Sequence, residues 1–373
     1  MDFSLSEEQV ELRDLARQIL EDQLTQERLR EIEREPEWFD RKLWADLARA
    51  NLLGLAVPEP YGGMGYGFLE LCLLLEQIGW TVAPVPALPT LVMGALPIAA
   101  FGSDAQRDRC LPRVVSGELV LTAALVEEGT DDPTRPLTLA RREGTSWRLE
   151  GIKTCVPAAH LAERVLVPAQ TEQGVGLFLL DPQADGVQLE GQETTNGEPQ
   201  FRITLSGARV DEADVLAGPA RGAEVLSWLL QHVTAAFAST QLGVSERALR
   251  MTASYTSERE QFGRRIATFQ AVAQRAANCY VDVEALRLTT QQAVWRLSEG
   301  LDAADEVAIA KYWVGETGHR VSYAAQHLHG GIGVDTDYPL HRYCFWSKHS
   351  ELSLGASIEQ LEKLGASLAQ DRV

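Results

Sequence analysis

Lysine is scarce in this chain. It occurs only five times, and arginine supplies the rest of the 34 basic residues. Basic residues as a whole are outnumbered by 53 acidic residues, which gives a formal net charge of −19. Because nucleic acid and anionic membranes bind basic protein surfaces, this balance argues against both as partners.

Cysteine and long apolar runs are scarce as well. The five cysteines lack the paired spacing of a metal site, so we expect reduced core residues and no disulfides. The histidines have no cysteine or carboxylate at ligand spacing, and no metal site is predicted. No apolar run approaches the length that spans a bilayer. The N-terminal stretch MDFSLSEEQ is polar and unlike a secretory leader, so we expect a cytoplasmic protein.

The periodicity of apolar residues changes twice along the 373 residues. Residues 1–118 have helical spacing, and Ser6 with Gln9 predicts a capping box at the first helix. Residues 119–221 have short strand-like runs between turn residues, which indicate an antiparallel β domain. Residues 222–373 are helical again and predict a four-helix bundle, with segments at about 223–257, 268–299, 302–328 and 339–370. The fold class is therefore α+β, with several domains.

Local features refine this prediction. We expect a helix from Trp38 to Leu53 that ends at Gly54, and a buried helix over Leu69–Ile78. The prolines between Ala83 and Pro97 are expected to interrupt the helices there. The acidic stretch Glu127–Asp132 is expected to be a solvated loop.

The segment Tyr255–Gln270 joins the first two long helical segments of the C-terminal part. It contains Arg259, Phe262 and Gly263. An arginine fork binds anionic oxygens, an aromatic ring packs on a planar ring, and glycine lets the backbone approach a ligand closely. These residues favour a site for a phosphate and a ring. The alternative is a basic, solvated turn.

This segment resembles the acyl-CoA dehydrogenase family. The similarity includes Phe269–Val272, His329–Gly333 and Asp337–Pro339, and it covers essentially the whole chain. It implies an N-terminal helical domain (1–118), a middle antiparallel β domain (119–221) and a C-terminal four-helix bundle (222–373) with the flavin and subunit contacts. It also implies FAD as cofactor, an acyl-CoA substrate and usually an electron-transfer flavoprotein as electron acceptor.

The resemblance further implies which residues bind the cofactor. In homotetrameric relatives, the arginine turn and the glycine loop reach the neighbouring subunit's flavin and hold its pyrophosphate and adenosine. Residue by residue, this role falls on Arg259, Phe262, Gln270, His327, Gly330, Gly331 and Gly333. His327 replaces the family's common glutamine, but its ring can still donate one hydrogen bond.

The catalytic base of the family has no counterpart. Removal of a proton beside a thioester needs a positioned carboxylate. The usual glutamate position is occupied by Leu354, and the alternative position of some members falls at or near Val233. Glu351, Glu359 and His232 are displaced along their helices, and geometry disfavours them as substitutes. The resemblance therefore implies no catalytic residue in this chain.

The flavin ring pocket is also altered. The family holds the ring with a Thr-Glu-Pro strand end and a Trp-Ile-Thr segment. The matching pieces are Val126–Glu128 and Cys155–Pro157, without the threonines and the tryptophan. This combination resembles the non-catalytic subunit of the α2β2 acyl-CoA dehydrogenases of actinobacteria, which act on steroid side-chain CoA thioesters in cholesterol and steroid catabolism. The partner would then be a homologous catalytic subunit. The alternatives are a self-sufficient homotetramer with a displaced base and a flavin-free acyl-CoA-binding scaffold.

Overall fold

The chain forms two compact units in a computed structural model that describes residues 3–370. The helical unit comprises Met1–Arg28, Cys72–Ala83 and Thr234–Val373, and the sheet unit comprises Leu29–Leu71 and Pro84–Val233. Two helices, α4 (Phe68–Thr81) and α7 (Gly222–Glu258), contribute residues to both units. An N-terminal helical part, a central sheet and a C-terminal helical region confirm the predicted α+β class. The domain boundaries at 118 and 221 stay a prediction.

The sheet unit is built around one sheet with the order β7-β8-β4-β3-β5-β6-β9. Most neighbours are antiparallel, as predicted, but β1 joins β5 in parallel, and β3 meets β5 in a parallel pair at Leu139 and Gln170. Phe178, Leu149 and Ile203 are fully buried in its core. The strands are β1 (Leu121–Ala123), β2 (Val126–Glu127), β3 (Leu139–Glu143), β4 (Ser146–Pro157), β5 (Arg164–Thr171), β6 (Gly174–Leu180), β7 (Val187–Gln192), β8 (Gln200–Asp211) and β9 (Val215–Ala217).

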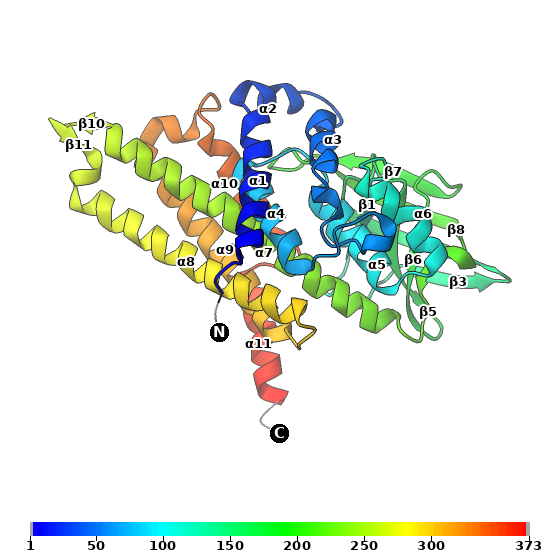
Figure 1. Ribbon diagram of the computed structural model, residues 1–373. Helices are drawn as coiled ribbons and strands as arrows, with labels where there is room; N and C mark the ends of the chain where they lie inside the picture. Colours follow the sequence, from blue (N-terminus) through cyan, green and yellow to red (C-terminus); the bar gives the residue numbers. More distant parts are fainter. Residues whose placement is uncertain (1–2, 371–373) are drawn as a thin grey trace. The chain divides into compact units, whose positions relative to one another are not determined.

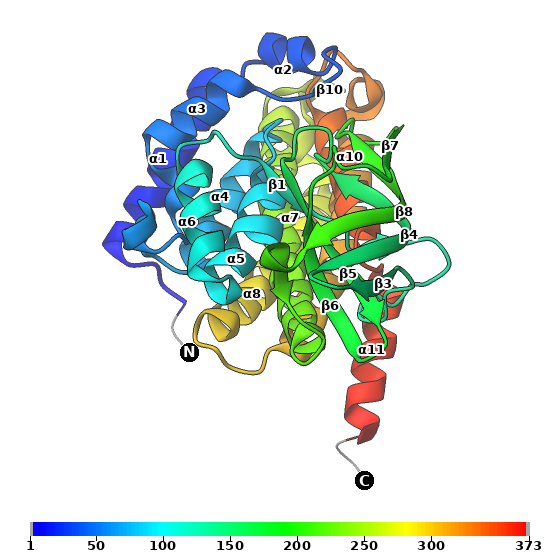
Figure 2. The ribbon, with the colours of Figure 1, turned by 90° about the vertical axis from the view of Figure 1, so that its right-hand side faces the viewer.

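Helices of the same unit cover part of this sheet, and Figure 2 shows α5 (Leu96–Phe101) and α6 (Asp104–Val115) beside it. The Gln106 side chain on α6 donates to the carbonyl of Val215 on β9 at 3.0 Å. The helix expected over Trp38–Leu53 is shorter, because α3 (Arg41–Arg49) ends before Asn51, whose φ of 58° is left-handed. A short 3-10 turn then covers Leu52–Gly54.

The proline-rich stretch is more helical than predicted. A π-helix spans Leu88–Ala95 and continues directly into α5. Pro89 and Pro97 are the second residues of these two segments. Pro89 is tolerated because it lies in the first turn, where its missing N–H would have no intrahelical partner. Pro84 and Pro86 lie in the non-helical break between α4 and this segment, as expected, whereas Pro89 and Pro97 lie within helical segments and do not interrupt them, which corrects the expectation for these two.

The helical unit begins with α1 (Glu7–Gln23), which carries the predicted capping box: Ser6 accepts from the Gln9 amide, and the Gln9 side chain accepts from the Ser6 amide. Figure 1 shows α8 and α9 running side by side, with the β10–β11 hairpin at the junction of α7 and α8. The other elements are α2 (Gln26–Ile32), β10 (Glu260–Gln261), β11 (Arg264–Arg265), α8 (Gln270–Ser298), α9 (Ala304–His329), α10 (Leu340–Leu352) and α11 (Ser357–Gln370).

The last predicted helix, 339–370, is in fact two helices. Leu354 and Gly355 have φ values of 55° and 93°, which a right-handed helix cannot contain. Lys311, fully buried on α9, closes the end of α10 because its ammonium donates to the carbonyls of Ser350 and Glu351 at 2.8 and 3.0 Å. The structure thus places the turn at Leu354 between two helices that are separately anchored.

No helix in residues 3–370 is long and apolar enough to cross a membrane.

Candidate functional site

The arginine turn forms a small hairpin at the end of α7. Glu260 and Gln261 pair with Arg265 and Arg264, and Phe262 and Gly263 form the turn with φ values of 55° and 74°. Positive φ at both central residues is the requirement of a type I′ turn. Glycine meets this requirement at little cost, whereas phenylalanine does not. The hairpin therefore holds an aromatic side chain in a strained backbone position, with the residue 91 % exposed.

Three predicted cofactor residues around this hairpin are free of contacts within the chain. Arg259, Gln270 and His327 are exposed, and the part of the chain that the structure describes gives their side chains no hydrogen bond, ion pair or ring contact. Neighbouring Arg264 differs, because its guanidinium lies 4.0 Å from the centre of the Phe269 ring. The uncommitted side chains are thus available to bind another molecule.

The glycine loop lies at the same end of the helical unit. Tyr255 near the end of α7 stacks on His329 at the end of α9, with ring centres 4.4 Å apart. Arg320 on α9 pairs with Asp282 on α8 at 3.1 Å. Along the axis of α8, Gln270 at its start lies about 18 Å from Asp282. Along the axis of α9, the glycine loop lies at about the same distance from Arg320. The fold thus brings Arg259, Gln270 and the loop to one end of the bundle.

Two glycines of this loop leave their backbone open. A side chain at Gly330 or Gly331 would meet no atom within 4 Å, and Gly330 has a φ of 65°. Gly333 is buried instead, since a Cβ there would lie 2.8 Å from the carbonyl oxygen of Gln326. The loop therefore has a packed base and an open crest. This arrangement suits close approach of a ligand group to the backbone, although the Gly330 N–H itself donates to the carbonyls of Gln326 and His327.

In the sheet unit, the two pieces matched to the ring pocket are neighbours. Val126 pairs with Thr154 and Glu127 pairs with Lys153 across β2 and β4. Glu127 is buried and forms an ion pair with the Lys153 ammonium, which also donates to the carbonyl of Pro168 at 2.7 Å. The expectation that Glu127 belongs to a solvated loop is wrong. No pattern in the sequence indicates this pair, because only the strand register brings the two residues together.

Burial and pairing act on this ion pair in opposite directions. Burial lowers the pKa of Lys153 to about 8, against the attraction of the Glu127 carboxylate. Burial also disfavours the charged form of Glu127, but Lys153 and the amide of Thr138 outweigh it and lower the pKa of this carboxyl. The pair therefore holds β2, β4 and the following loop together and offers no free group to a ligand.

The end of β4 offers few hydrogen-bonding groups for a flavin ring. Pro157 has neither a backbone N–H nor a hydroxyl, and its carbonyl accepts from Thr122 at 2.7 Å. The amide of Cys155 donates to the Gln192 side chain at 2.9 Å, and the same side chain bonds the Thr154 hydroxyl at 3.1 Å. Cys155 is exposed, unlike the other cysteines, which are buried. The residues present at this strand end do not fit an isoalloxazine.

The alternative base position is equally closed. Val233 on α7 is fully buried. His232 beside it bonds the carbonyl of Trp228 through Nδ1 at 2.8 Å, and its ring centre lies 3.8 Å from Trp228 and 4.7 Å from Phe68. Burial lowers the pKa of His232 to about 4. Its ring is packed among aromatic side chains as a core residue.

Glu359 comes closer to the turn at Leu354 than its place in the sequence indicates. Its Oε2 lies 3.7 Å from where a Cβ on Gly355 would be. This oxygen is buried and has no hydrogen-bond partner in residues 3–370. Glu351 is instead paired with Lys348 at 2.6 Å. Glu359 therefore supplies a carboxylate near the expected site, with its Oε2 shielded from solvent.

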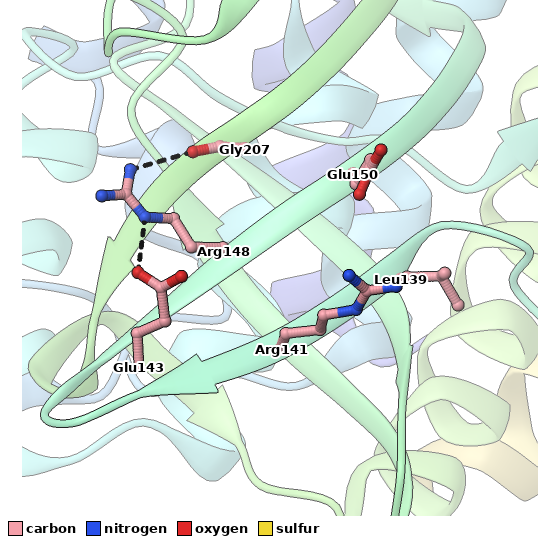
Figure 3. A pocket seen from close by; sticks show the side chains of 6 residues that line it. All are labelled: Leu139, Arg141, Glu143, Arg148, Glu150 and Gly207. Atoms are coloured by element: carbon pink, nitrogen blue, oxygen red, sulfur yellow. Dashed lines mark hydrogen bonds and ion pairs between the residues drawn. The ribbon is translucent and has the colours of Figure 1, made fainter.

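A hollow of about 410 Å³ lies on the outer face of the sheet (Figure 3). Arg148 lies across it and donates to the Glu143 carboxylate and to the carbonyl of Gly207, both at 3.0 Å. The charges of the two arginines and two glutamates in its lining cancel, so the hollow favours neither an anion nor a cation. The lining residues are Leu139, Arg141, Glu143, Arg148, Glu150 and Gly207. No group of three or more His, Cys, Asp or Glu side chains in the described residues could hold a metal ion.

Comparison with known proteins identifies the family. Residues 6–118 match the family model "Acyl-CoA dehydrogenase, N-terminal domain", and residues 220–369 match "Acyl-CoA dehydrogenase, C-terminal domain". The chain belongs to the acyl-CoA dehydrogenase family, as the resemblance implied. It is 39 % identical to "Acyl-CoA dehydrogenase FadE27" of Mycobacterium tuberculosis strain H37Rv over 99 % of each chain.

Two solved structures are similar over 99 % of each chain. One is a variant of the Tcur3481-Tcur3483 steroid ACAD, with 44 % identity and a TM-score of 0.93. The other is the ChsE4-ChsE5 complex from Mycobacterium tuberculosis, with 40 % identity and a TM-score of 0.94. Both structures are named after two proteins. The first is also named as a steroid ACAD.

Proposed function

We propose that this chain is the non-catalytic subunit of an FAD-dependent acyl-CoA dehydrogenase that acts on a steroid side-chain CoA thioester. It completes the FAD site of a homologous catalytic subunit and supplies no base of its own. The observation that carries this proposal is the contrast between the two halves of the family's flavin site. Arg259 is exposed and uncommitted, Phe262 is exposed with an edge-to-face contact to Phe269, and the crest at Gly330 has open space beside it. The strand end at Cys155–Pro157 is instead closed by the chain's own contacts.

In this assignment, each exposed group has a role towards the partner's FAD. Arg259 neutralises the pyrophosphate, and the open crest at Gly330 and Gly331 lets the pyrophosphate approach the backbone closely. Phe262 packs beside a planar ring, and Gln270 and His327 add hydrogen bonds. Bound FAD supplies the hydride acceptor for the α,β-dehydrogenation. The chain's own residues bind and orient it, and the partner holds the base.

An exposed apolar surface supports assembly with a partner. Helices α8, α9 and α10 leave large apolar side chains in solvent, and such surfaces mark interfaces. They are Tyr280, Val281, Leu288, Tyr323 and Phe345. The two-component names of the similar structures support a hetero-oligomer, and the steroid enzyme among them supports the substrate class. We further propose an α2β2 assembly, a cytoplasmic location and an electron-transfer flavoprotein as electron acceptor.

The decisive experiment is flavin content. The chain is purified alone and after co-expression with a homologous subunit from the same genome, chosen because it carries a glutamate at the position of Leu354 or Val233 and an intact Trp-Ile-Thr segment. We expect a colourless chain alone and about one FAD per unlike pair in the complex. Arg259→Ala should lower flavin retention in the complex by about tenfold or more, because one charge-assisted contact to phosphate is lost.

Arg135→Ala is the matched control for this variant. Arg135 lies on an exposed loop with its side chain 87 % accessible, so its removal should leave flavin retention unchanged. A yellow isolated chain that is bleached by an acyl-CoA would favour the self-sufficient homotetramer. A chain that captures no flavin even with its partner would favour the acyl-CoA-binding scaffold.

A further inference from the structure

The hydrogen bonds of His329, the last residue of α9, define which of its ring nitrogens carries the proton. His329 is buried, and its Nδ1 lies 2.8 Å from the carbonyl oxygen of Ala325. A carbonyl only accepts, so Nδ1 carries the proton. Burial lowers the pKa of His329 and keeps the ring neutral. Its Nε2 is then an acceptor, and the Tyr338 hydroxyl at 3.1 Å is its donor.

A third ring completes the cluster. Tyr255 on α7 stacks on His329 with an interplanar angle of 18°, and its hydroxyl donates to the His329 carbonyl at 3.4 Å. The Tyr255 and Tyr338 rings meet edge to face at 6.4 Å. The cluster therefore joins α7, α9 and the segment before α10. The same end of α7 continues directly into Arg259.

The glycine loop Gly330–Val334 lies between two members of this cluster. His329 precedes the loop, and Tyr338 follows it by four residues. The hydrogen bond between their side chains thus closes the loop across its base, while Gly333 packs on Gln326 beneath it. With both ends fixed, the open crest at Gly330 and Gly331 has little freedom.

We propose that His329 is a positioning residue: its bond to Tyr338 and its stack on Tyr255 hold the glycine loop and the end of α7 in one arrangement before flavin arrives. This inference rests on the proposed function, because it assigns the loop to the partner's FAD. A loop that is already ordered binds without the entropy loss of ordering it. Removal of the bond should therefore weaken FAD binding without any change in the groups that touch FAD.

The test is the dissociation constant of FAD from the assembled complex, measured by the fluorescence of released flavin. Tyr338→Phe removes one hydroxyl and should raise the constant about fivefold. His329→Phe keeps a ring for the stack, removes both hydrogen bonds, and should raise it about tenfold or more. The double variant should be no weaker than His329→Phe, because both changes remove the same bond. Tyr66→Phe is the control, since its exposed hydroxyl has no partner in the described residues.

A merely structural role gives a different pattern. In that case the melting temperature of the isolated chain and the yield of complex would fall. The complex that still assembles would bind FAD as tightly as the wild type does, and this result would overturn the inference. If His329→Phe does not fold, Tyr338→Phe carries the test alone. If the wild-type complex binds FAD and Tyr338→Phe leaves the constant unchanged, only the positioning role is lost. If the wild-type complex binds no FAD, the proposed function fails with it.

Discussion

Glu359 is the residue that separates the two catalytic hypotheses most directly. It brings a carboxylate to within 3.7 Å of the Cβ position of Gly355, next to Leu354. We predict that Glu359→Gln leaves the turnover of the complex within about twofold, because Oε2 is buried and the proposed function assigns the base to the partner. The measurement is reduction of an artificial electron acceptor with a steroid-type acyl-CoA.

Glutamine is the appropriate replacement because it keeps the volume and removes the ionisable group. A loss of two or more orders of magnitude in kcat, with assembly and flavin content unchanged, would make Glu359 the displaced base and this chain catalytic. Glu362→Gln is the control: Glu362 lies on the same helix, one turn further on, and is exposed.

At the scale of residues, the sequence pattern predicted the exposed half of the proposed site but not the contacts that support it. Arg259, Phe262 and the glycines could be proposed from the sequence because the arginine turn and the glycine loop are continuous in sequence. The bond between His329 and Tyr338 spans nine residues and depends on how α9 ends, and no periodicity predicts it. The distance of Glu359 from the turn was misjudged because helical spacing was assumed through Leu354.

Among the elements, the crossing of α4 and α7 in the helical unit depends on two glycines. A Cβ on Gly79 would lie 1.9 Å from the carbonyl oxygen of Thr240, and one on Gly243 would lie 1.9 Å from that of Glu76. The two backbones therefore touch directly. We predict that Gly243→Ala lowers the free energy of unfolding by about 2–4 kcal/mol, because a methyl group forces the helices apart. Denaturant unfolding measures this change.

Gly365→Ala is the matched control on α11. A Cβ there meets no atom within 4 Å, and the backbone is helical, so alanine should leave stability unchanged or raise it by up to about 1 kcal/mol. Equal effects of the two substitutions would contradict a close contact between α4 and α7.

Elements were predicted well wherever periodicity was long. The three long segments at 223–257, 268–299 and 302–328 correspond closely to α7, α8 and α9. The division of 339–370 was missed because the apolar pattern continues across the turn, and only Gly355 marked it. The helix at Leu88–Ala95 was missed because a proline in the first turn does not break a helix.

For the molecule as a whole, two buried histidines contribute to how the free energy of unfolding responds to mild acid. Burial lowers the pKa of both His232 and His349 to about 4, and the Lys311 ammonium adds to the effect at His349. In the unfolded chain a histidine titrates near a pKa of about 6.5. Above this pH both states are neutral and the stability is fully present. As the pH falls from about 6.5 towards 4, these two histidines bind protons in the unfolded state only, and their contribution to stability is lost.

Each of the two histidines should lower the free energy of unfolding by up to about 3 kcal/mol over this pH range. Denaturant unfolding at several pH values, from neutral down to the folded-state pKa, measures the slope of the free energy of unfolding against pH. His232→Phe should flatten it, because the replacement packs against Trp228 and does not titrate. His319→Gln should leave the slope unchanged, since His319 is exposed on α9. A slope that His232→Phe does not alter would assign the acid sensitivity to other groups.

The turn at Leu354 has a consequence for how such a subunit can arise. Its left-handed backbone costs a leucine roughly 1 kcal/mol, and the Gln360 side chain holds it by donating to the carbonyls of Leu354 and Gly355 at 3.3 Å. The backbone is thus fixed by a neighbouring helix, whichever side chain the turn carries. Under the proposed function, a duplicated gene copy exchanges the carboxylate at this turn by point substitution and keeps the backbone in place. A division of labour between gene copies then requires no new architecture.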